Sequence, residues 1–365
     1  MYFDIVKLDP VNNYCLFTLD QLILLKQSIS QENLDAYIED MKMLFDAPLE
    51  TVTSKEHSLS LNKHDYVSLA TYYWPDPSKP DGLPYIQKDG YANPEGQNYD
   101  KDKLRRLAHL VYHASILYYL TGHKTYQRLI QKHLEHFFID PKTKMNPNLD
   151  YGQFIRGHQT GRKEGIIDYA ANFTYALNIL MHLESLKLID DVLMTNLRSW
   201  HQDFLEWLMH SKIGSDEAMA LNNHGTFYDL TCVVISKFVQ KNANLSNWQK
   251  KFKERINYQI DIDGAMPLEL KRTKSLSYSF MNLKGLIELN NQLDLKSPLK
   301  LVVAIKWLIE QGINNTWRYE QVTPVDPGIY LLHQSIYKDL YGIDVKLDIN
   351  HNNVINKTLW YLHKK

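Results

Sequence analysis

The sequence has few cysteines and no excess of either charge. Its 365 residues include 2 cysteines, too few for a disulfide framework and without the spacing of metal ligands, which argues against redox chemistry. Lysine and arginine number 41 against 42 for aspartate and glutamate, so the net positive charge of most nucleic-acid-binding proteins is missing. We therefore expect no nucleic-acid partner, and an acidic ligand must be met by a few well-placed cations.

Long apolar runs and leader-like segments are missing as well. The apolar clusters are short, as in 301–305, far below the ~20 residues that span a bilayer, so no membrane partner is expected. The first residues include acidic side chains, a proline and asparagines, where a signal peptide has a basic start and an apolar run. We expect a cytoplasmic protein if Met1 is the native start; otherwise the protein is exported and its signal has been removed.

The sequence also lacks the signatures of several site types. There is no Gly-rich phosphate loop, no GxSxG and no CxxC, which argues against nucleotide, hydrolase-elbow and redox sites. His109 and His113 lie four residues apart without an adjoining glutamate. His133 and His136 flank Glu135 at the wrong spacing for a zinc protease. We therefore predict neither a metal nor a cofactor.

Helical periodicity dominates what is present. Leu104, Leu107 and Val111 follow three- and four-residue steps, and residues 197–208 repeat the pattern. Further helices are predicted at 19–28, 31–45, 124–138, 168–186, 225–240, 246–260, 275–292, 298–312 and 328–340. No low-complexity linker divides the chain, so we expect one mainly α-helical domain over 1–365. Successive helix pairs of similar length suggest helical hairpins wound into a toroid.

Three breaks interrupt the helical pattern, at 70–100, 140–165 and 261–268. The first is rich in proline, glycine and acidic residues around aromatic ones, so it cannot be a regular helix and is predicted to be a long ordered loop. Long loops in compact domains tend to carry function.

An amide-rich triplet precedes the helix predicted at 225–240. Asn222, Asn223 and His224 would project near the start of that helix, a place that suits anions. The alternative is that an asparagine caps the helix and the histidine is incidental.

A cation-rich turn precedes the helix predicted at 275–292. Lys271 and Arg272 lie in this turn, and Tyr278 follows the arginine by six residues. Because residues six apart on a helix are about 120° from alignment, the arginine and the tyrosine can meet only if the helix begins after the arginine. The alternative is a solvated basic turn and a core tyrosine.

Two loop motifs add aromatic and polar side chains. Tyr72, Tyr73 and Trp74 are followed by prolines, and flat rings held rigidly can stack on sugars; the alternative is a loop pinned to the body by its aromatics. Arg156, His158 and Arg162 lie among glycines that allow close approach to a carboxylate, and the alternative is a flexible polar loop.

Together these clusters resemble the alginate-lyase family of polysaccharide lyases, whose members carry an Asn-Asn-His triplet, a later arginine followed by a helical tyrosine, and a proline-rich stretch like residues 64–85 here. The resemblance covers 64–282 and includes the motifs of 146–168. It implies an all-α fold, an incomplete α/α toroid with long functional loops. It also implies an acidic polysaccharide or oligosaccharide substrate that is cleaved by β-elimination without a cofactor.

The resemblance also implies residue roles. The C5 proton of a uronate is hard to remove because negative charge develops beside a carboxylate, so the site must neutralise that carboxylate. Asn223 and Arg272 would hold the carboxylate, and His224 would be the base or assist it. Tyr278 would protonate the glycosidic oxygen or act as both base and acid, and a tyrosine base needs a depressed pKa, which Arg272 and His224 could provide. The implied substrate-binding residues are Tyr72, Tyr73, Trp74, Arg156, His158, Arg162, Asn222 and Lys271.

Two departures leave the substrate open. Many members have seven residues from the arginine to the tyrosine and follow the triplet with Ser-Tyr-Trp, whereas here the step is six and the sequence continues with residues 225–227, Gly-Thr-Phe. The chain is therefore nearer to the divergent branch that includes glucuronan lyases. Two other functions are alternatives: a glycoside hydrolase using a pair drawn from Asp168, Asp229 and Glu269, or a non-catalytic sugar-binding protein.

Overall fold

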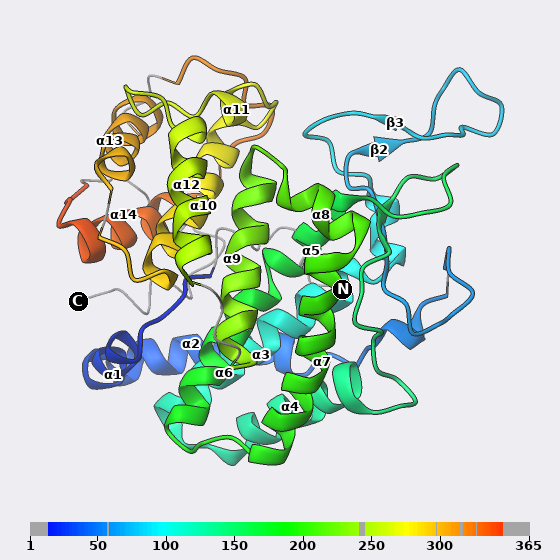
Figure 1. Ribbon diagram of the computed structural model, residues 1–365. Helices are drawn as coiled ribbons and strands as arrows, with labels where there is room; N and C mark the ends of the chain where they lie inside the picture. The colour runs from blue at the N-terminus through cyan, green and yellow to red at the C-terminus, as the bar shows by residue number, and fades with distance from the viewer. Residues whose placement is uncertain are drawn as a thin grey trace.

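The computed structural model describes residues 14–56, 58–240, 245–296, 298–313, 317–325 and 327–345, and this part of the chain is mainly helical, as predicted (Figure 1). The α-helices are α1 (Leu19–Ser28), α2 (Gln31–Phe45), α3 (Lys101–Thr121), α4 (Lys124–Leu134), α5 (Ile166–Ala170), α6 (Phe173–Ser185), α7 (Asp191–His210), α8 (Lys212–Ala218), α9 (Asn223–Phe238), α10 (Leu245–Gln259), α11 (Pro267–Leu270), α12 (Ser275–Gln292), α13 (Leu299–Leu308) and α14 (Pro327–Tyr341). The strands are β1 (Val67–Leu69), β2 (Tyr73–Trp74), β3 (Ile86–Gln87) and β4 (Tyr151–Phe154). Shorter helical turns are η3 (Val52–Ser54), η4 (Pro94–Asn98), η5 (Glu135–Ile139), η6 (Lys163–Gly165) and η7 (Ile309–Ile313).

The helices form two layers. Helices α3, α6, α9 and α12 pack side by side in that order, while α4 packs on α3, α7 and α10 on α9, and α13 on α12. The inner helices α9 and α12 are buried nearly all round, polar side chains such as Asp229 and Asn282 included, whereas α10 buries a single stripe of four residues. A helix that is buried all round must be surrounded by other elements, so burial separates the inner layer from the outer one. The fold is an incomplete α/α toroid, as expected.

Most helix boundaries follow the sequence prediction, and two differences matter. The ranges 19–28, 31–45 and 275–292 agree with the structure. The helix predicted at 168–186 divides into α5 and α6 at Asn172, whose φ of −124° and ψ of −72° are not helical. Helix α8 was not predicted; its seven residues are too few for a periodic signal, and the side chain of Ser211 caps it by accepting a hydrogen bond from the backbone of Gly214.

The predicted loop at 70–100 is ordered and contains a small hairpin. Strands β2 and β3 pair antiparallel, with Tyr73 opposite Gln87, and the hairpin projects from the side of the helical body (Figure 1). Strand β1 pairs in parallel with β4, with Val67 opposite Tyr151. These two short ladders place the loops around 72–90 and 155–165 on the same side of the molecule as α8 (Figure 1).

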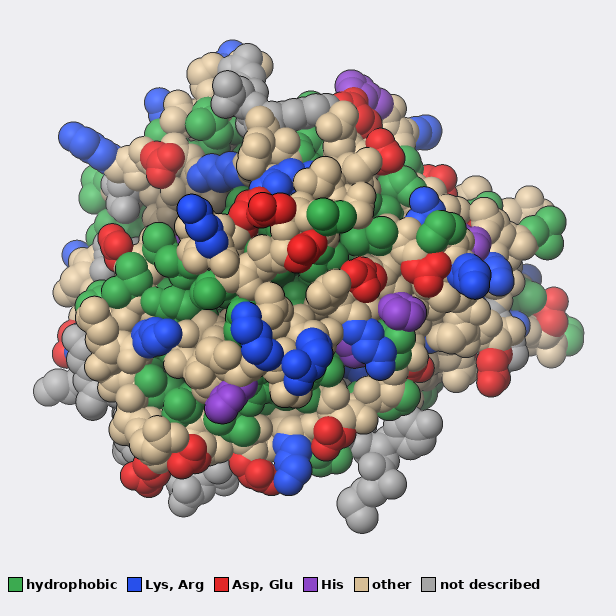
Figure 2. Space-filling model, turned by 90° about the horizontal axis from the view of Figure 1, so that it is seen from below, with side chains coloured by type: hydrophobic (Ala, Val, Ile, Leu, Met, Phe, Trp, Pro, Cys, Tyr) green, Lys and Arg blue, Asp and Glu red, His purple; other side chains and the backbone are tan. Residues whose placement is uncertain are grey.

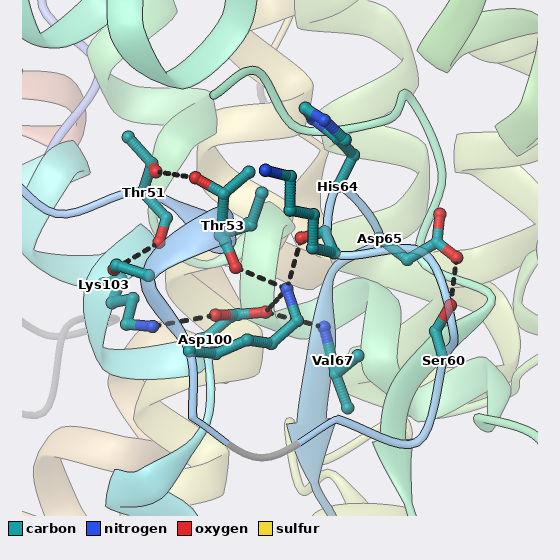
Figure 3. Close-up of polar contacts among 12 residues, drawn as sticks. Thr51, Thr53, Ser60, His64, Asp65, Val67, Asp100 and Lys103 are labelled. Atoms are coloured by element: carbon teal, nitrogen blue, oxygen red, sulfur yellow. Dashed lines mark hydrogen bonds and ion pairs between the residues drawn. The ribbon is translucent and has the colours of Figure 1, made fainter. Parts of the chain in front are cut away.

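A buried aspartate ties these loops to the helices. At the start of α3, Asp100 accepts a hydrogen bond from the backbone N–H of Val67 at 3.0 Å and pairs with Lys103 Nζ at 3.2 Å (Figure 3). The Lys55 side chain is 2% exposed, and its Nζ lies 3.1 Å from the same carboxylate. Burial raises the pKa of Asp100, and the two lysines oppose that rise. The network anchors β1 and the turn before it to the end of an inner helix.

The surface carries no field of a single sign on the face drawn in Figure 2, where basic, acidic and apolar side chains are interspersed. This agrees with the balanced composition. Within the described ranges, none of the helices combines the length and the apolar character that crossing a membrane requires.

Four buried histidines are held neutral by the core. Burial lowers the pKa of His113, His201 and His333 to about 3, and that of His133 to about 4. Because these folded-state values lie below the unfolded value near 6.5, the unfolded chain binds protons first as the pH falls. Stability is therefore complete above pH ~6.5 and is lost as the pH drops toward the folded-state values.

We expect the substitution His133→Leu to flatten this pH dependence. No hydrogen bond to the His133 ring is found among the described residues, so leucine leaves none of their polar groups without its partner. Between pH 7 and pH 5 the unfolding free energy of the wild type should fall by roughly 2 kcal/mol more than that of the variant. Urea unfolding at both pH values measures the difference, with the exposed His123→Gln as control. Identical pH dependence in wild type and variant would contradict the assignment.

Candidate active site

Three segments meet at one end of the inner helices. The first is the N-terminus of α9, which carries Asn223 and His224. The second runs from α11 to the first turns of α12 and carries Arg272 and Tyr278. The third consists of Tyr72 and Asp89, which flank the β2–β3 hairpin on its two sides. Because α9 and α12 are packed neighbours, their first turns bring two distant stretches of sequence together.

A buried glutamate joins the first two segments. Glu269 is 0% exposed and accepts hydrogen bonds from the backbone N–H of Asn223 at 2.8 Å and from its side-chain Nδ2 at 2.7 Å. Burial raises the pKa of Glu269, while the bonds from Asn223 and the charges of Arg272 and His224 act against that rise. Asn223 contacts this carboxylate directly, and Arg272 and His224 are near enough for their charges to act on it.

His224 is held by a second buried carboxylate. Its Nδ1 lies 2.6 Å from Oε1 of Glu217, whose side chain is 1% exposed, whereas the His224 side chain is 18% exposed. Burial lowers the pKa of His224, but Glu217 and, more weakly, Glu164 outweigh that effect and raise it above its usual value; Arg272 opposes them. With Nδ1 turned to Glu217, the other ring nitrogen, Nε2, is the one left for a ligand.

Arg272 is fixed by Asp89, which follows strand β3. Its Nε and Nη2 donate to the two carboxylate oxygens of Asp89 at 3.1 and 2.7 Å, a two-point ion pair. Thr273 also donates to Asp89, through its backbone N–H at 3.3 Å and its hydroxyl at 3.0 Å. The pKa of Arg272 is raised by this aspartate, so the guanidinium stays charged.

The predicted arginine and tyrosine meet. Nη2 of Arg272 donates to the Tyr278 hydroxyl at 3.0 Å, and the guanidinium lies 4.0 Å from the centre of the tyrosine ring. Helix α12 begins at Ser275, after the arginine, which is the condition that the six-residue spacing imposed. The alternative of a solvated turn and an unrelated core tyrosine does not describe this contact.

The expectation of a depressed pKa at Tyr278 is wrong. Burial raises the pKa of Tyr278 well above its usual value, and Tyr72 and Asp89 add to the rise. The charge of Arg272 lowers it but does not compensate. The sequence shows that a guanidinium is near, but the degree of burial depends on packing that only the fold provides.

The aromatic triplet has more polar contacts than a stacking surface alone requires. The hydroxyl of Tyr72 lies 2.8 Å from that of Tyr278. The guanidinium of Arg162 lies 4.9 Å from the centre of the Tyr73 ring, and Arg162 also pairs with Glu164 at 3.0 Å. The indole Nε1 of Trp74 donates to a backbone carbonyl of its own loop at 2.8 Å. Tyr72 thus reaches the Arg272–Tyr278 pair directly, and Arg162 is next to it through Tyr73.

Arg156 and His158 lie elsewhere. They line a cavity of about 570 Å³ that also includes Glu56, Glu95 and Tyr99, and none of the four predicted catalytic residues lines it. Arg156 forms an ion pair with Glu95 at 2.5 Å, so its charge is already neutralised. Their role in substrate binding stays a prediction.

The last two predicted residues flank the cluster. Asn222 is the N-cap residue of α9, but its side chain makes no capping hydrogen bond, so helix capping does not explain the triplet. Lys271 is exposed beside Arg272. Within the described ranges, no group of three or more histidine, cysteine, aspartate or glutamate side chains is placed to hold a metal ion.

Sequence reasoning missed three carboxylates. Asp89 and Glu217 were not singled out, and Glu269 was considered only as a hydrolase acid. Two of them are distant in sequence from the residues that they hold, since Asp89 is 183 residues from Arg272 and Glu269 is 46 residues from Asn223. A possible signal for Glu217 was its position seven residues before His224, but without α8 that spacing predicts nothing.

Solved structures of alginate lyases are similar to this chain in fold. A crystal structure of an alginate lyase from Bacteroides ovatus is similar over 89% of this chain and 90% of that one, with a TM-score of 0.80 and 29% identity. Alginate lyase A1-III from Sphingomonas species A1 shares the fold over 92% of this chain and 89% of its own, with a TM-score of 0.57 and 15% identity. An A1-III variant complexed with a tetrasaccharide gives 0.54 and 16%, over 90% and 85% of the two chains.

The comparison with curated proteins found no match. The model of the family described as alginate lyase matches residues 51–294, more than half of the chain and the segment that contains every predicted site residue. The chain therefore belongs to the alginate lyase family of polysaccharide lyases.

Proposed function

We propose that this enzyme cleaves a uronate-containing glycan of the alginate or glucuronan type by β-elimination and leaves a 4,5-unsaturated uronate at the new end. The family and the names of the similar structures support an acidic polysaccharide, and one of those structures holds a tetrasaccharide. The observation that carries the proposal is the position of Arg272. It donates to Tyr278, and its charge acts on both His224 and Glu269.

The first task of the site is to neutralise the uronate carboxylate. Asp89 and Tyr278 use Nε and Nη2 of Arg272, so Nη1 is the nitrogen that can meet the substrate. Asn223 donates one N–H of its side-chain amide to Glu269, and the second N–H can donate to the uronate carboxylate. Both donors are held in place before substrate arrives, which is what stabilisation of a developing charge requires.

The base and the acid are then separate groups. His224, with Nδ1 turned to Glu217, presents Nε2 to take the C5 proton. Tyr278 keeps its proton at neutral pH because its pKa is raised, so it is suited to protonate the glycosidic oxygen. Because the pKa of His224 is also raised, its neutral form, which can accept the C5 proton, becomes available as the pH rises through that pKa, while Tyr278 remains protonated.

Bonds broken and bonds formed balance in the proposed β-elimination. The C5–H bond breaks and its proton goes to His224, the electron pair forms the C4=C5 double bond, and the C4–O bond breaks. The leaving oxygen takes the proton of Tyr278. The enzyme is reset when the imidazolium loses a proton and the tyrosinate regains one, with solvent as the carrier.

The carboxylates considered for a hydrolase are committed to other contacts. Asp168 accepts hydrogen bonds from Tyr66 and Ser68 at 3.1 and 2.6 Å inside the protein. Asp229 is paired with Arg255 Nε at 2.7 Å, and both side chains are 1% exposed. Glu269 is fully buried on Asn223. This supports a lyase over a hydrolase, which needs two carboxyl groups on either side of the scissile bond.

Product chemistry tests the proposal. The protein is incubated with polymannuronate, polyguluronate, glucuronan and glycosaminoglycans, and both ultraviolet absorbance and reducing ends are measured. Elimination raises both signals, hydrolysis raises reducing ends alone, and a binding protein raises neither. Since mannuronate and guluronate differ in configuration at C5, the preferred polymer also shows from which face the proton is taken.

We expect Tyr278→Phe to lower kcat roughly 100-fold or more while substrate affinity changes little. Phenylalanine keeps the ring under Arg272 but has no proton to donate, and loss of a general acid has an effect of this size. The measurement is steady-state ultraviolet kinetics together with calorimetric binding of an oligosaccharide. Turnover equal to that of the wild type would remove Tyr278 from the reaction.

We expect Tyr72→Phe to lower kcat about fivefold to tenfold, the effect of one lost hydrogen bond, because its hydroxyl no longer contacts that of Tyr278. Tyr73→Phe is the matched control, since it removes a hydroxyl from the adjacent residue and keeps the ring beside Arg162. If both variants change only KM, and equally, the residues act as a binding surface and the hydroxyl contact has no part in the chemistry.

A further inference from the structure

A buried carboxylate with one unused oxygen lies behind His224. Glu217 is in the last turn of α8, is 1% exposed, and places Oε1 2.6 Å from the Nδ1 of His224. Its other oxygen, Oε2, is buried and has no hydrogen-bond partner among the described residues. A buried carboxylate costs several kcal/mol unless a donor or a positive charge compensates it. Within the described part of the chain, the group in hydrogen-bond contact with this carboxylate is the imidazole of His224.

We propose that Glu217 is a positioning residue of the lyase reaction: its carboxylate holds the Nδ1–H of His224, turns Nε2 toward the substrate and stabilises the imidazolium formed when the C5 proton is taken. The inference rests on the proposed role of His224 as the base. It extends that role to a residue on a different helix that does not contact the sugar.

The position of α8 makes this arrangement rigid. Ser211 caps the helix on the N–H of Gly214, and a side chain at position 214 would collide with the backbone oxygen of Leu208 at 1.9 Å. The helix packs against α7, α9 and the turn η6. The contacts named here involve the backbone and small residues, and none of them uses the charge of Glu217.

The other charges around His224 do not replace Glu217. From η6, Glu164 also raises the pKa of His224, but it is paired with Arg162 at 3.0 Å and acts more weakly. Arg272 lowers that pKa. Glu269, on α11, is engaged by Asn223. Glu217 is the acidic group in direct contact with the ring, so it decides how strongly the imidazole holds a proton.

The charge of Glu217 shifts the pH dependence of kcat/KM in a defined direction. His224 must be neutral to accept the C5 proton, so kcat/KM rises with pH through the pKa of His224. Removing the charge of Glu217 lowers that pKa, because burial and Arg272 are then opposed only by the weaker effect of Glu164. The acid limb of the pH profile moves to lower pH, and the plateau falls because the imidazolium is less stabilised.

The experiment compares the full chain with Glu217→Gln, which has the same shape and can still accept a hydrogen bond from Nδ1. The titration of His224 is followed by NMR of the ¹⁵N-labelled imidazoles, assigned with His224→Ala, and kcat/KM is measured over the same pH range. We expect the His224 pKa and the acid limb to move down together by about one unit or more, and the plateau to fall roughly tenfold to 100-fold.

Two variants serve as controls. Glu206→Gln removes a carboxylate that lies 3.2 Å from His210 on the surface of α7 and should change neither the titration of His224 nor kcat/KM. Glu217→Asp keeps the charge and should leave the acid limb nearer to that of the wild type, and it provides the test if the glutamine variant does not fold.

The outcomes separate the two proposals. An unchanged titration of His224 in Glu217→Gln overturns the role of Glu217, whatever the activity. A titration that moves while the acid limb stays in place overturns it as well, and it also removes His224 as the base, which is a failure of the proposed function. Movement of both, with no effect of Glu206→Gln, supports the inference.

Discussion

The site depends on one buried contact, in which the Glu269 carboxylate accepts two hydrogen bonds from Asn223. A fully buried carboxylate is costly, and two N–H donors together with the charges of Arg272 and His224 offset that cost. The contact fixes α11 against the first turn of α9, so the turn that carries Arg272 has one position relative to the amide and the imidazole. Without it, the first turns of α9 and α12 would be neighbours but their side chains would have no common register.

From this contact the charges alternate across the site. Glu217 contacts His224, the carboxylate of Glu269 is acted on by the charges of both His224 and Arg272, and Asp89 pairs with Arg272. Each cation is thus held by a carboxylate of the protein, which orients it before substrate binds. The arrangement has a consequence for recognition. In the proposed reaction a uronate carboxylate would meet a guanidinium whose two-point edge is already occupied by Asp89, so the Asn223 amide would have to contribute to holding the acid group.

The extent to which the sequence predicts this site follows from the range of each interaction. The triplet ending in His224 and the pair formed by Arg272 and Tyr278 are local patterns, and the start of α12 after the arginine follows from their spacing. Partners such as Glu217 and Asp89 are chosen by the packing of separate segments, and nothing in their local sequence distinguishes them from other acidic residues. The pKa of Tyr278 was predicted with the wrong sign because a cation beside it is visible in the sequence, whereas its burial is not.

Because the pKa of Tyr278 is raised rather than lowered, the pH dependence expected of the enzyme has a simple form. Because burial, Tyr72 and Asp89 keep the proton on Tyr278 far above neutral pH, the tyrosine does not change state over the range in which His224 titrates. In the proposed reaction the acid limb of activity then reports His224 alone, since Tyr278 stays protonated throughout that range although Arg272 acts on both residues. A tyrosine acting as its own base would instead need Arg272 to prevail over burial, and in this structure burial is the larger effect.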